Sequence, residues 1–343
     1  MAAKRKSSAS KAKSQVRRKT KQAAKKVAWQ FQWRWGITLP VFLILLVFAA
    51  AFAYGAYLES GGNEKEPQIV TENFINLDAD LSVHYIDVGQ GDCSLVVYGD
   101  NTVLIDAGER EYGEAVVNYI RSLGIEQLDY IIATHPHSDH IGGLTDVINE
   151  FEAGTVIAPR VSDELVPTGS SYENFLKALS KKGLRLTAAE AGTVYDISKA
   201  EKEGDNTYFE ILGPVRSDYE DLNDWSVVIR LVHGENSFVF TGDAGTAAEE
   251  DILLLPKDIS ADVLKVGHHG SSTANSKLFL MRVAPKAAII PCGNDNPYGH
   301  PHKEVIDRLK LLGTEFYRTD AFGTVIVYSD GEEIRIRTEK ESS

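Results

Sequence analysis

Cysteine is nearly absent from this sequence, since only Cys93 and Cys292 occur among its 343 residues. So few cysteines exclude a dense disulfide framework, and their spacing does not fit a zinc site built from cysteine ligands. Each cysteine lies in an apolar run that is typical of a strand, so we expect buried free thiols. A single disulfide formed in an oxidising compartment is the alternative.

Acidic residues are absent from the first 58 positions, which contain 12 Lys and Arg. The remainder of the chain holds 24 basic and 49 acidic residues, so its net charge is about −25, whereas the whole chain carries −13. A domain with this charge repels polyanions on average. Nucleic-acid binding by the remainder would therefore need basic residues gathered at one place.

Composition divides the chain into four segments. Residues 1–35 are basic and rich in Ser and Ala, and we expect a disordered cytoplasmic tail. Residues 36–58 are apolar and uncharged, which suffices for one transmembrane helix at about 1.5 Å per residue. Residues 59–80 form a polar linker, and residues 81–339 form the folded domain.

The charge around the apolar segment predicts an orientation. Because Lys and Arg mark the cytoplasmic side of a membrane helix, we expect a single-pass cell-membrane protein with a cytoplasmic N-terminus and an extracellular catalytic domain. The membrane is thus a predicted partner, reached through the N-terminal helix. A cleaved signal peptide is the alternative, although its basic region would be unusually long.

The folded domain begins with strands and continues with alternating strands and helices. Ser82–Val88 and Asp92–Tyr98 are predicted to form a hairpin. Helices are expected at 113–123, 172–182, 246–255, 276–283 and 302–312, and further strands at 103–105, 130–134, 208–212, 226–232, 237–241, 262–266, 287–291, 324–328 and 333–337. This order predicts a mixed α/β (α+β) fold with helices covering sheets.

Four polar residues follow the apolar strand that ends near Thr134, namely His135, His137, Asp139 and His140. His135 and His137 can converge on one metal ion, while Asp139 and His140 reach an adjacent position. Imidazole and carboxylate ligands suit Zn, Mn or Fe. Three of the nine histidines of the chain lie here, which argues against an ordinary solvated loop. The sequence therefore predicts a metal-dependent hydrolase site.

This loop, Thr134-His-Pro-His-Ser-Asp-His140, resembles the signature of the metallo-β-lactamase superfamily. Five further segments occur in the order that is found in the extracellular metallo-β-lactamase-like domain of ComEC, the DNA-uptake channel. They are His84–Ser94, Leu104–Gly108, Phe240–Gly245, Leu264–Ser272 and Asn296–His302. The resemblance covers about residues 81–337, while the multi-span channel of ComEC is replaced by one anchor.

The resemblance implies a four-layer αββα metallo-β-lactamase sandwich, preceded here by a single transmembrane helix. It implies one or two divalent metal ions, Zn or Mn, and no organic cofactor. Asp243 matches the carboxylate that bridges two metals, although Gly-Asp after a strand is also a common turn. A late histidine completes the second site, and we favour His300, because it follows the last core strand.

The resemblance also gives roles to other histidines and polar residues. His268 and His269 are expected to face the substrate as ligand, proton donor or phosphate contact, and they could exchange roles with His300 and His302. A third histidine for the first metal is missing, and Asn223 with Ser226 resembles the Asn-x-x-Ser of ComEC-like domains instead. A weakened first site makes one metal ion, or Mn rather than Zn, credible.

Four more residues lie near the predicted site. Asp92 and Asp106 end apolar strands, where they either orient metal-binding histidines or cap turns. Ser271 offers a hydroxyl to a phosphate or carboxylate, or else belongs to a helix cap. Lys265 supplies local positive charge that a nucleic acid would need.

The expected reaction uses metal-activated water, because no Ser or Cys nucleophile motif is present. Asp139 would orient the hydroxide or take its proton, and His268 or His269 would stabilise charge on a phosphoryl or acyl oxygen. The resemblance favours a phosphodiesterase or DNase linked to DNA uptake or degradation, with DNA and the competence machinery as partners. A hydrolase of esters, lactones or β-lactams and a non-catalytic DNA-uptake accessory module are the alternatives.

Overall fold

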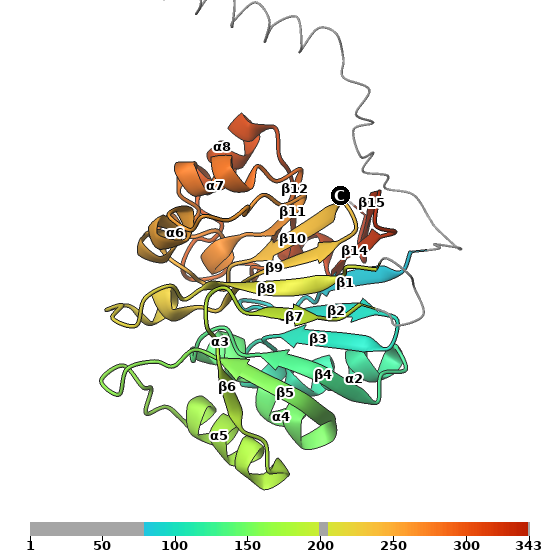
Figure 1. Ribbon diagram of the computed structural model, residues 1–343, viewed down its shortest axis with the longest axis vertical. Coiled ribbons are helices and arrows are strands. Elements are labelled where there is room, and N and C mark those ends of the chain that lie inside the picture. The colour runs from blue at the N-terminus through green and yellow to red at the C-terminus, as the bar shows by residue number, and fades with distance from the viewer. Residues whose placement is uncertain (1–78, 199–204, 342–343) are drawn as a thin grey trace, which may run out of the picture. The chain divides into compact units, whose positions relative to one another are not determined.

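Two sheets and three groups of apolar side chains organise the domain, in a computed structural model that describes residues 79–198 and 205–341. The first sheet has eight strands in the order β15-β14-β1-β2-β3-β4-β5-β6. The second has seven in the order β13-β12-β11-β10-β9-β8-β7. The predicted mixed α/β fold of two sheets with helices is confirmed (Figure 1).

The strands and helices have the following bounds. The strands are β1 (Leu81–Tyr85), β2 (Ser94–Tyr98), β3 (Asn101–Ile105), β4 (Gln127–Ile132), β5 (Glu152–Ala158), β6 (Leu186–Ala188), β7 (Val194–Asp196), β8 (Tyr208–Gly213), β9 (Val228–His233), β10 (Asn236–Phe240), β11 (Val263–Lys265), β12 (Ala287–Ile290), β13 (Glu315–Arg318), β14 (Val325–Ser329) and β15 (Ile334–Thr338). The α-helices are α2 (Gly113–Ser122), α3 (Ser138–Ile141), α4 (Leu144–Glu150), α5 (Ser170–Lys182), α6 (Thr246–Leu253), α7 (Lys277–Val283), α8 (Lys303–Leu312) and α9 (Thr319–Phe322). Short 3-10 helices lie at η1 (Arg110–Tyr112), η2 (Leu222–Trp225) and η3 (Gly267–Gly270).

Central strands are apolar on both faces, because each sheet is covered on both sides. In β10, Phe238 and Phe240 belong to the core between the sheets, whereas Val239 belongs to the core under the helices. The side chains of a strand point alternately to its two faces, so this pattern shows that the sheet packs against one layer on each face. Stacking of Tyr85 on Phe240, with ring centroids 5.8 Å apart, joins the two sheets.

Helices cover the outer face of each sheet. One apolar cluster lies between the first sheet and α2, α4 and α5. Another lies between the second sheet and α6, α7 and α8 (Figure 1). The layers thus run helix, sheet, sheet, helix, and the burial of apolar area between them is the main stabilising term.

The carboxyl ends of several strands meet at one edge of this sandwich. Strands β3 and β4 are parallel in the first sheet, and β10, β11 and β12 are parallel in the second. The carboxyl ends of parallel strands lie at the same edge, where α/β proteins usually bind their ligands. The polar residues singled out in the sequence follow these strands directly.

The predicted single-pass membrane localisation is wrong. Within residues 79–198 and 205–341, no helix is long and apolar enough to cross a membrane. The longest helix there, α5, has 13 residues, or about 20 Å at 1.5 Å per residue, against a hydrocarbon core of about 30 Å. The predicted tail 1–35, anchor 36–58 and most of the linker 59–80 lie outside the described residues.

The core between the sheets should dominate stability. Phe238 is fully buried there, so Phe238→Ala should lower the free energy of unfolding by about 3–5 kcal/mol in urea titrations. Leu311 is 75% exposed on α8, and Leu311→Ala should change the same quantity by less than about 0.5 kcal/mol. Equal effects of the two substitutions would contradict this assignment of the core.

Candidate metal centre

The histidine-rich loop begins where β4 ends. After His137 the chain forms the short helix α3, which carries Asp139 and His140. The backbone of Gly91, in the loop before β2, lies against this helix: a Cβ there would be 2.5 Å from the carbonyl oxygen of Asp139. A glycine at this position therefore lets the loop after β1 approach the loop after β4.

Four residues, Asp139, His140, Asp243 and His269, form what we call the four-ligand group. One ligand atom from each lies within 4.8 Å of the others. His140 Nε2 is 3.3 Å from Asp243 Oδ1, and His269 Nε2 is 3.2 Å from Asp139 Oδ2 and 3.6 Å from Asp243 Oδ2. Two carboxylates and two imidazoles from three loops thus converge on one point.

His135 and His137 lie beside this group. His135 Nε2 is 2.9 Å from His137 Nδ1, and the ring centroids of His135 and His140 are 4.1 Å apart. His135 is fully buried, whereas His137 is half-buried. The structure therefore gathers the four residues of the signature loop at one place, with an imidazole pair next to the four-ligand group.

Asp106 fixes the orientation of His140. Its Oδ2 accepts a hydrogen bond from His140 Nδ1 at 2.7 Å, which leaves Nε2 directed toward Asp243. The same carboxylate accepts the backbone N–H of Thr134 at 2.8 Å and its hydroxyl at 2.6 Å. A carboxylate in this position sets the tautomer and ring orientation of a metal-binding histidine.

Asp92 lies beside His269. Its Oδ1 is 3.3 Å from His269 Nδ1 but makes no hydrogen bond, because Nδ1 donates to the carbonyl oxygen of Pro291 at 3.1 Å. Lys265 forms an ion pair with Asp92 and donates to the carbonyl oxygen of Gly242 at 2.8 Å. Only 2% of Lys265 is exposed, so its ammonium compensates Asp92 and cannot meet a nucleic acid at the surface.

The turn that carries His268 and His269 is held in an unfavourable backbone conformation. Both residues have positive φ, 50° and 52°, which costs non-glycine residues free energy. Asn275 stabilises the turn: its Oδ1 accepts the N–H of Gly267 at 2.9 Å, and its Nδ2 donates to the carbonyl of Gly267 at 2.8 Å. The buried carboxylate of Glu249 in turn accepts the N–H of Asn275.

The site concentrates negative charge. Burial alone would lower the pKa of His269, but Asp243, Asp139 and Asp92 raise it to about 10. The pKa of His140 is likewise raised well above its usual value, by Asp243 first, against the effect of burial. Burial would raise the pKa of Asp243, but His140 and His269 hold it well below its usual range. The carboxylates therefore favour a positive charge at this point, which protons on the two imidazoles or a bound cation can supply.

The donors of the four-ligand group fit a divalent metal ion. His140 Nε2 and Asp243 Oδ1 are buried and make no hydrogen bond, although they face each other. A buried polar atom without a partner is costly, and a metal ion between the two would satisfy both. Nitrogen and carboxylate donors in this number suit Zn or Mn.

A cavity of about 330 Å³ opens onto the four-ligand group. Its lining comes from loops of both sheets and includes several histidines. The lining residues are Gln90, His137, Ser138, Asp139, Asn223, Asp243, His268, His269, Tyr298 and His300. A cavity of this volume is large enough for a small ligand or for one unit of a polymer.

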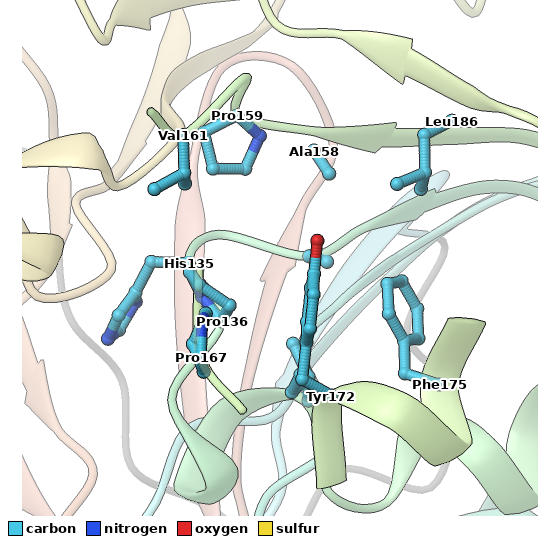
Figure 2. Close-up of a pocket in the computed structure, with 11 residues that line it drawn as sticks. His135, Pro136, Ala158, Pro159, Val161, Pro167, Tyr172, Phe175 and Leu186 are labelled. Carbon is cyan, nitrogen blue, oxygen red and sulfur yellow. The ribbon is translucent and has the colours of Figure 1, made fainter. Parts of the chain in front are cut away.

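A second, apolar pocket lies behind His135 (Figure 2). Tyr172 and Phe175 rise into it from α5, opposite Ala158 and Leu186. Its volume of about 20 Å³ has room for little more than one water molecule. The pocket therefore packs the back of the metal-binding loop and is too small to receive a substrate.

His300 lies outside the four-ligand group, in which the structure places His269. Its ring faces the cavity, 5.6 Å from the ring of His268. Gln90 Oε1 accepts the N–H of Gly293 at 3.0 Å, which turns the Gln90 amide nitrogen toward His300 Nδ1 at 3.5 Å. Gln90 thus favours the tautomer of His300 that carries its proton on Nε2.

His302 joins two loops. Its Nδ1 accepts the N–H of Ser272 at 2.9 Å, so Nε2 carries the proton and donates to the carbonyl oxygen of Tyr298 at 3.2 Å. Both ring nitrogens are therefore engaged within the protein. This position supports the loop that carries His300.

Asn223 and Ser226 occupy different places relative to the cavity. Asn223 lines it, and its buried Oδ1 makes no hydrogen bond. Ser226 Oγ accepts the N–H of Asp243 at 3.0 Å and lies 3.4 Å from His135 Nδ1, so it holds these two residues in place. Ser271 is buried and forms a hydrogen bond with Thr273, and it does not line the cavity.

Sequence reasoning assigned no role to Gln90, Tyr298 or Asn275. Gln90 stands between two glycines in a segment that was singled out, and Tyr298 lies in the last one. Their position within these segments was the available signal. Asn275 gave none, because its contacts with Gly267 depend on a turn that only the structure shows.

Comparison with known proteins gives consistent matches. Residues 86–294 match the Metallo-beta-lactamase superfamily. ComE operon protein 3 of Bacillus subtilis (strain 168) is 31% identical over 73% of this chain and 33% of its own length. Competence protein ComA of Neisseria gonorrhoeae is 28% identical over 79% and 35%, and Recombination protein 2 of Haemophilus influenzae is 30% identical over 71% and 28%. The chain thus spans about a third of the length of these relatives, and the resemblance inferred from the sequence is confirmed.

Removing the charge of Asp106 should weaken metal binding. In Asp106→Asn the side chain has only one accepting oxygen, so it cannot accept every hydrogen bond that Thr134 and His140 donate to the carboxylate. Affinity for Mn²⁺ should therefore fall about 10- to 100-fold in calorimetric titrations. Asp129 forms a similar strand-bridging contact with Thr102 at the far end of β4. Asp129→Asn should leave the affinity unchanged, and equal losses in both variants would contradict the orienting role.

Metal binding should release protons. The pKa of His140 is raised well above its usual value and that of His269 to about 10, so the carboxylates around both rings favour their protonated forms. A metal ion needs the unprotonated nitrogens, so Mn²⁺ affinity should rise with pH, by about tenfold per unit for each proton displaced. Calorimetry in two buffers of different ionisation enthalpy counts these protons. An affinity independent of pH from 6 to 9 would show that these rings do not bind the metal.

Proposed function

The chain belongs to the metallo-beta-lactamase superfamily, and we propose that it is a metal-dependent phosphodiesterase that acts on DNA. The observation that carries the proposal is the four-ligand group, in which His140 Nε2 and Asp243 Oδ1 face each other without a hydrogen bond. Its other members, Asp139 and His269, line a cavity together with Asp243. Zn or Mn is the proposed ion.

The four-ligand group would hold the metal ion more strongly than the pair His135 and His137 would hold a second one. Four donors surround one point, whereas the pair has no third histidine and Ser226 stands nearby instead. When bound, a divalent ion lowers the pKa of a coordinated water and polarises a phosphoryl oxygen. All other groups needed for the reaction come from the chain.

Asp139 and His268 are placed to handle protons. Asp139 is 28% exposed at the cavity, and His140 and His269 hold its pKa below the usual value despite burial. Its carboxylate therefore stays ionised and can accept a hydrogen bond from an attacking water. His268 is 24% exposed at the cavity, and burial lowers its pKa. The neutral ring can donate a hydrogen bond to a phosphoryl oxygen.

His300 adds a second donor. Burial lowers its pKa to about 4, so the ring is neutral at pH 7 and donates through Nε2 while Gln90 faces Nδ1. His268 and His300 lie on the same side of the cavity, with ring centroids 5.6 Å apart. Two neutral N–H donors suit the two non-bridging oxygens of a phosphodiester, whose single negative charge the metal ion balances.

The relatives supply the argument for DNA. Two of them carry competence or the ComE operon in their names, and the third is named a recombination protein. We propose that this chain likewise acts with a competence or DNA-uptake machinery. Its match covers only about a third of each relative, so the activity of those whole proteins is not carried over.

Nuclease assays test the proposal. Linear and single-stranded DNA should be cleaved with Mn²⁺ or Zn²⁺ and spared after chelation, and Asp139→Asn should slow cleavage by about 100-fold or more. Asp129→Asn, which changes a similar carboxylate remote from the cavity, should cleave at the wild-type rate.

Substrates of other classes decide between the alternatives. Turnover of a lactone or β-lactam, with DNA left intact, would overturn the phosphodiesterase and favour a small-molecule hydrolase. A chain that binds the metal ion and DNA but turns over none of these substrates would be a non-catalytic accessory module.

A further inference from the structure

Tyr298 is the only aromatic residue among the described residues that is mainly exposed, at 64%. It lines the cavity over the four-ligand group and also a neighbouring cavity of about 770 Å³. The residue therefore lies at the boundary between two hollows beside the four-ligand group. The structure of its loop shows that this exposure is maintained.

Hydrogen bonds tie together the loop around Tyr298. Asn296 Nδ2 donates to the carbonyl oxygens of Gly293 at 2.9 Å and His300 at 2.7 Å, and its Oδ1 accepts the N–H of His300 at 2.9 Å. His302 donates to the carbonyl oxygen of Tyr298. The Tyr298 ring stacks on His300, with centroids 5.5 Å apart and planes at 22°. One ring is therefore held over another beside the cavity.

The neighbouring cavity is unsuitable for a phosphate backbone. Glu109, Glu111 and Asp295 line it without an ion pair to any basic residue in the part of the chain that the structure describes. Lys340 is the basic residue in that lining, and it already lies 3.9 Å from Asp87. A nucleic acid that extends from the metal centre would gain little from phosphate contacts here.

We propose that Tyr298 is a stacking platform that receives a nucleobase next to the phosphodiester bound at the four-ligand group. This rests on the proposed phosphodiesterase function and adds the source of substrate affinity. Bases stack on exposed aromatic rings without sequence preference, and an unpaired base is needed for the ring to be reached. The preferred substrate is therefore single-stranded DNA, bound through its bases more than through its backbone.

An oligonucleotide with and without bases tests the proposal. Fluorescently labelled oligothymidylate and an abasic oligomer of equal length share the same phosphodiester backbone, so their difference reports base recognition. For the wild-type protein loaded with Mn²⁺, KM and the dissociation constant from anisotropy should be about 5- to 100-fold lower for oligothymidylate. Tyr298→Leu should reduce this ratio to about one, whereas Tyr298→Phe, which keeps the ring, should preserve it.

Leu311→Ala provides a matched control, because it removes an exposed apolar side chain from α8. Its ratio should equal that of the wild type. A weak dependence of binding on salt, with a slope below about two counterions, is the second expected result.

The outcomes separate the platform from the proposed function. A Tyr298→Leu variant that keeps the wild-type ratio, or that weakens both oligomers equally, would overturn the platform while cleavage still supports the nuclease. If the wild type cleaves neither oligomer, the phosphodiesterase is overturned. The anisotropy ratio then still decides whether Tyr298 recognises bases.

Discussion

Carboxylates buried at the meeting point of two sheets determine how the site is built. Asp92, Asp106 and Asp243 are almost fully buried, and Asp139 is mostly so. Charges in such surroundings need partners, and two imidazoles, the ammonium of Lys265 and the hydroxyl of Thr134 provide them in part. They leave Asp92 Oδ1, Asp243 Oδ1 and His140 Nε2 without a hydrogen bond, and the last two face each other 3.3 Å apart. A divalent cation between these two atoms would satisfy both.

Polar residues that follow apolar strands were the predictable part of this site. Because parallel strands end at one edge, His135–His140, Asp243 and the pair His268 and His269 could be expected together from the sequence. The predicted strands at 237–241 and 287–291 and the helix at 302–312 agree closely with β10, β12 and α8, whereas the strand predicted at 130–134 shares only residues 130–132 with β4. Strong apolar runs and clear ends made these elements readable.

Other features depend on contacts that a single sequence does not contain. The strands β5, β6, β7 and β13 were not predicted. Three of them, β6, β7 and β13, are edge strands of three or four residues, and β5 begins with exposed or half-buried residues. His269 and His300 both follow core strands, and only the strained turn at 267–270 brings His269 to the metal position. The sequence indicates that Lys265 is a surface charge, and only the structure shows that it pairs with Asp92. Composition alone likewise gave no sign that Tyr298 stays exposed.

We infer that the four-ligand group binds a divalent ion. Elemental analysis of the purified protein after dialysis measures this, with Asp243→Asn and Asp129→Asn analysed beside the wild type and circular dichroism confirming that all are folded. We expect at least one equivalent of Zn or Mn in the wild type and in Asp129→Asn, and its loss in Asp243→Asn. Metal retained by folded Asp243→Asn, or a wild-type chain that takes up none when Mn²⁺ or Zn²⁺ is supplied, would contradict it.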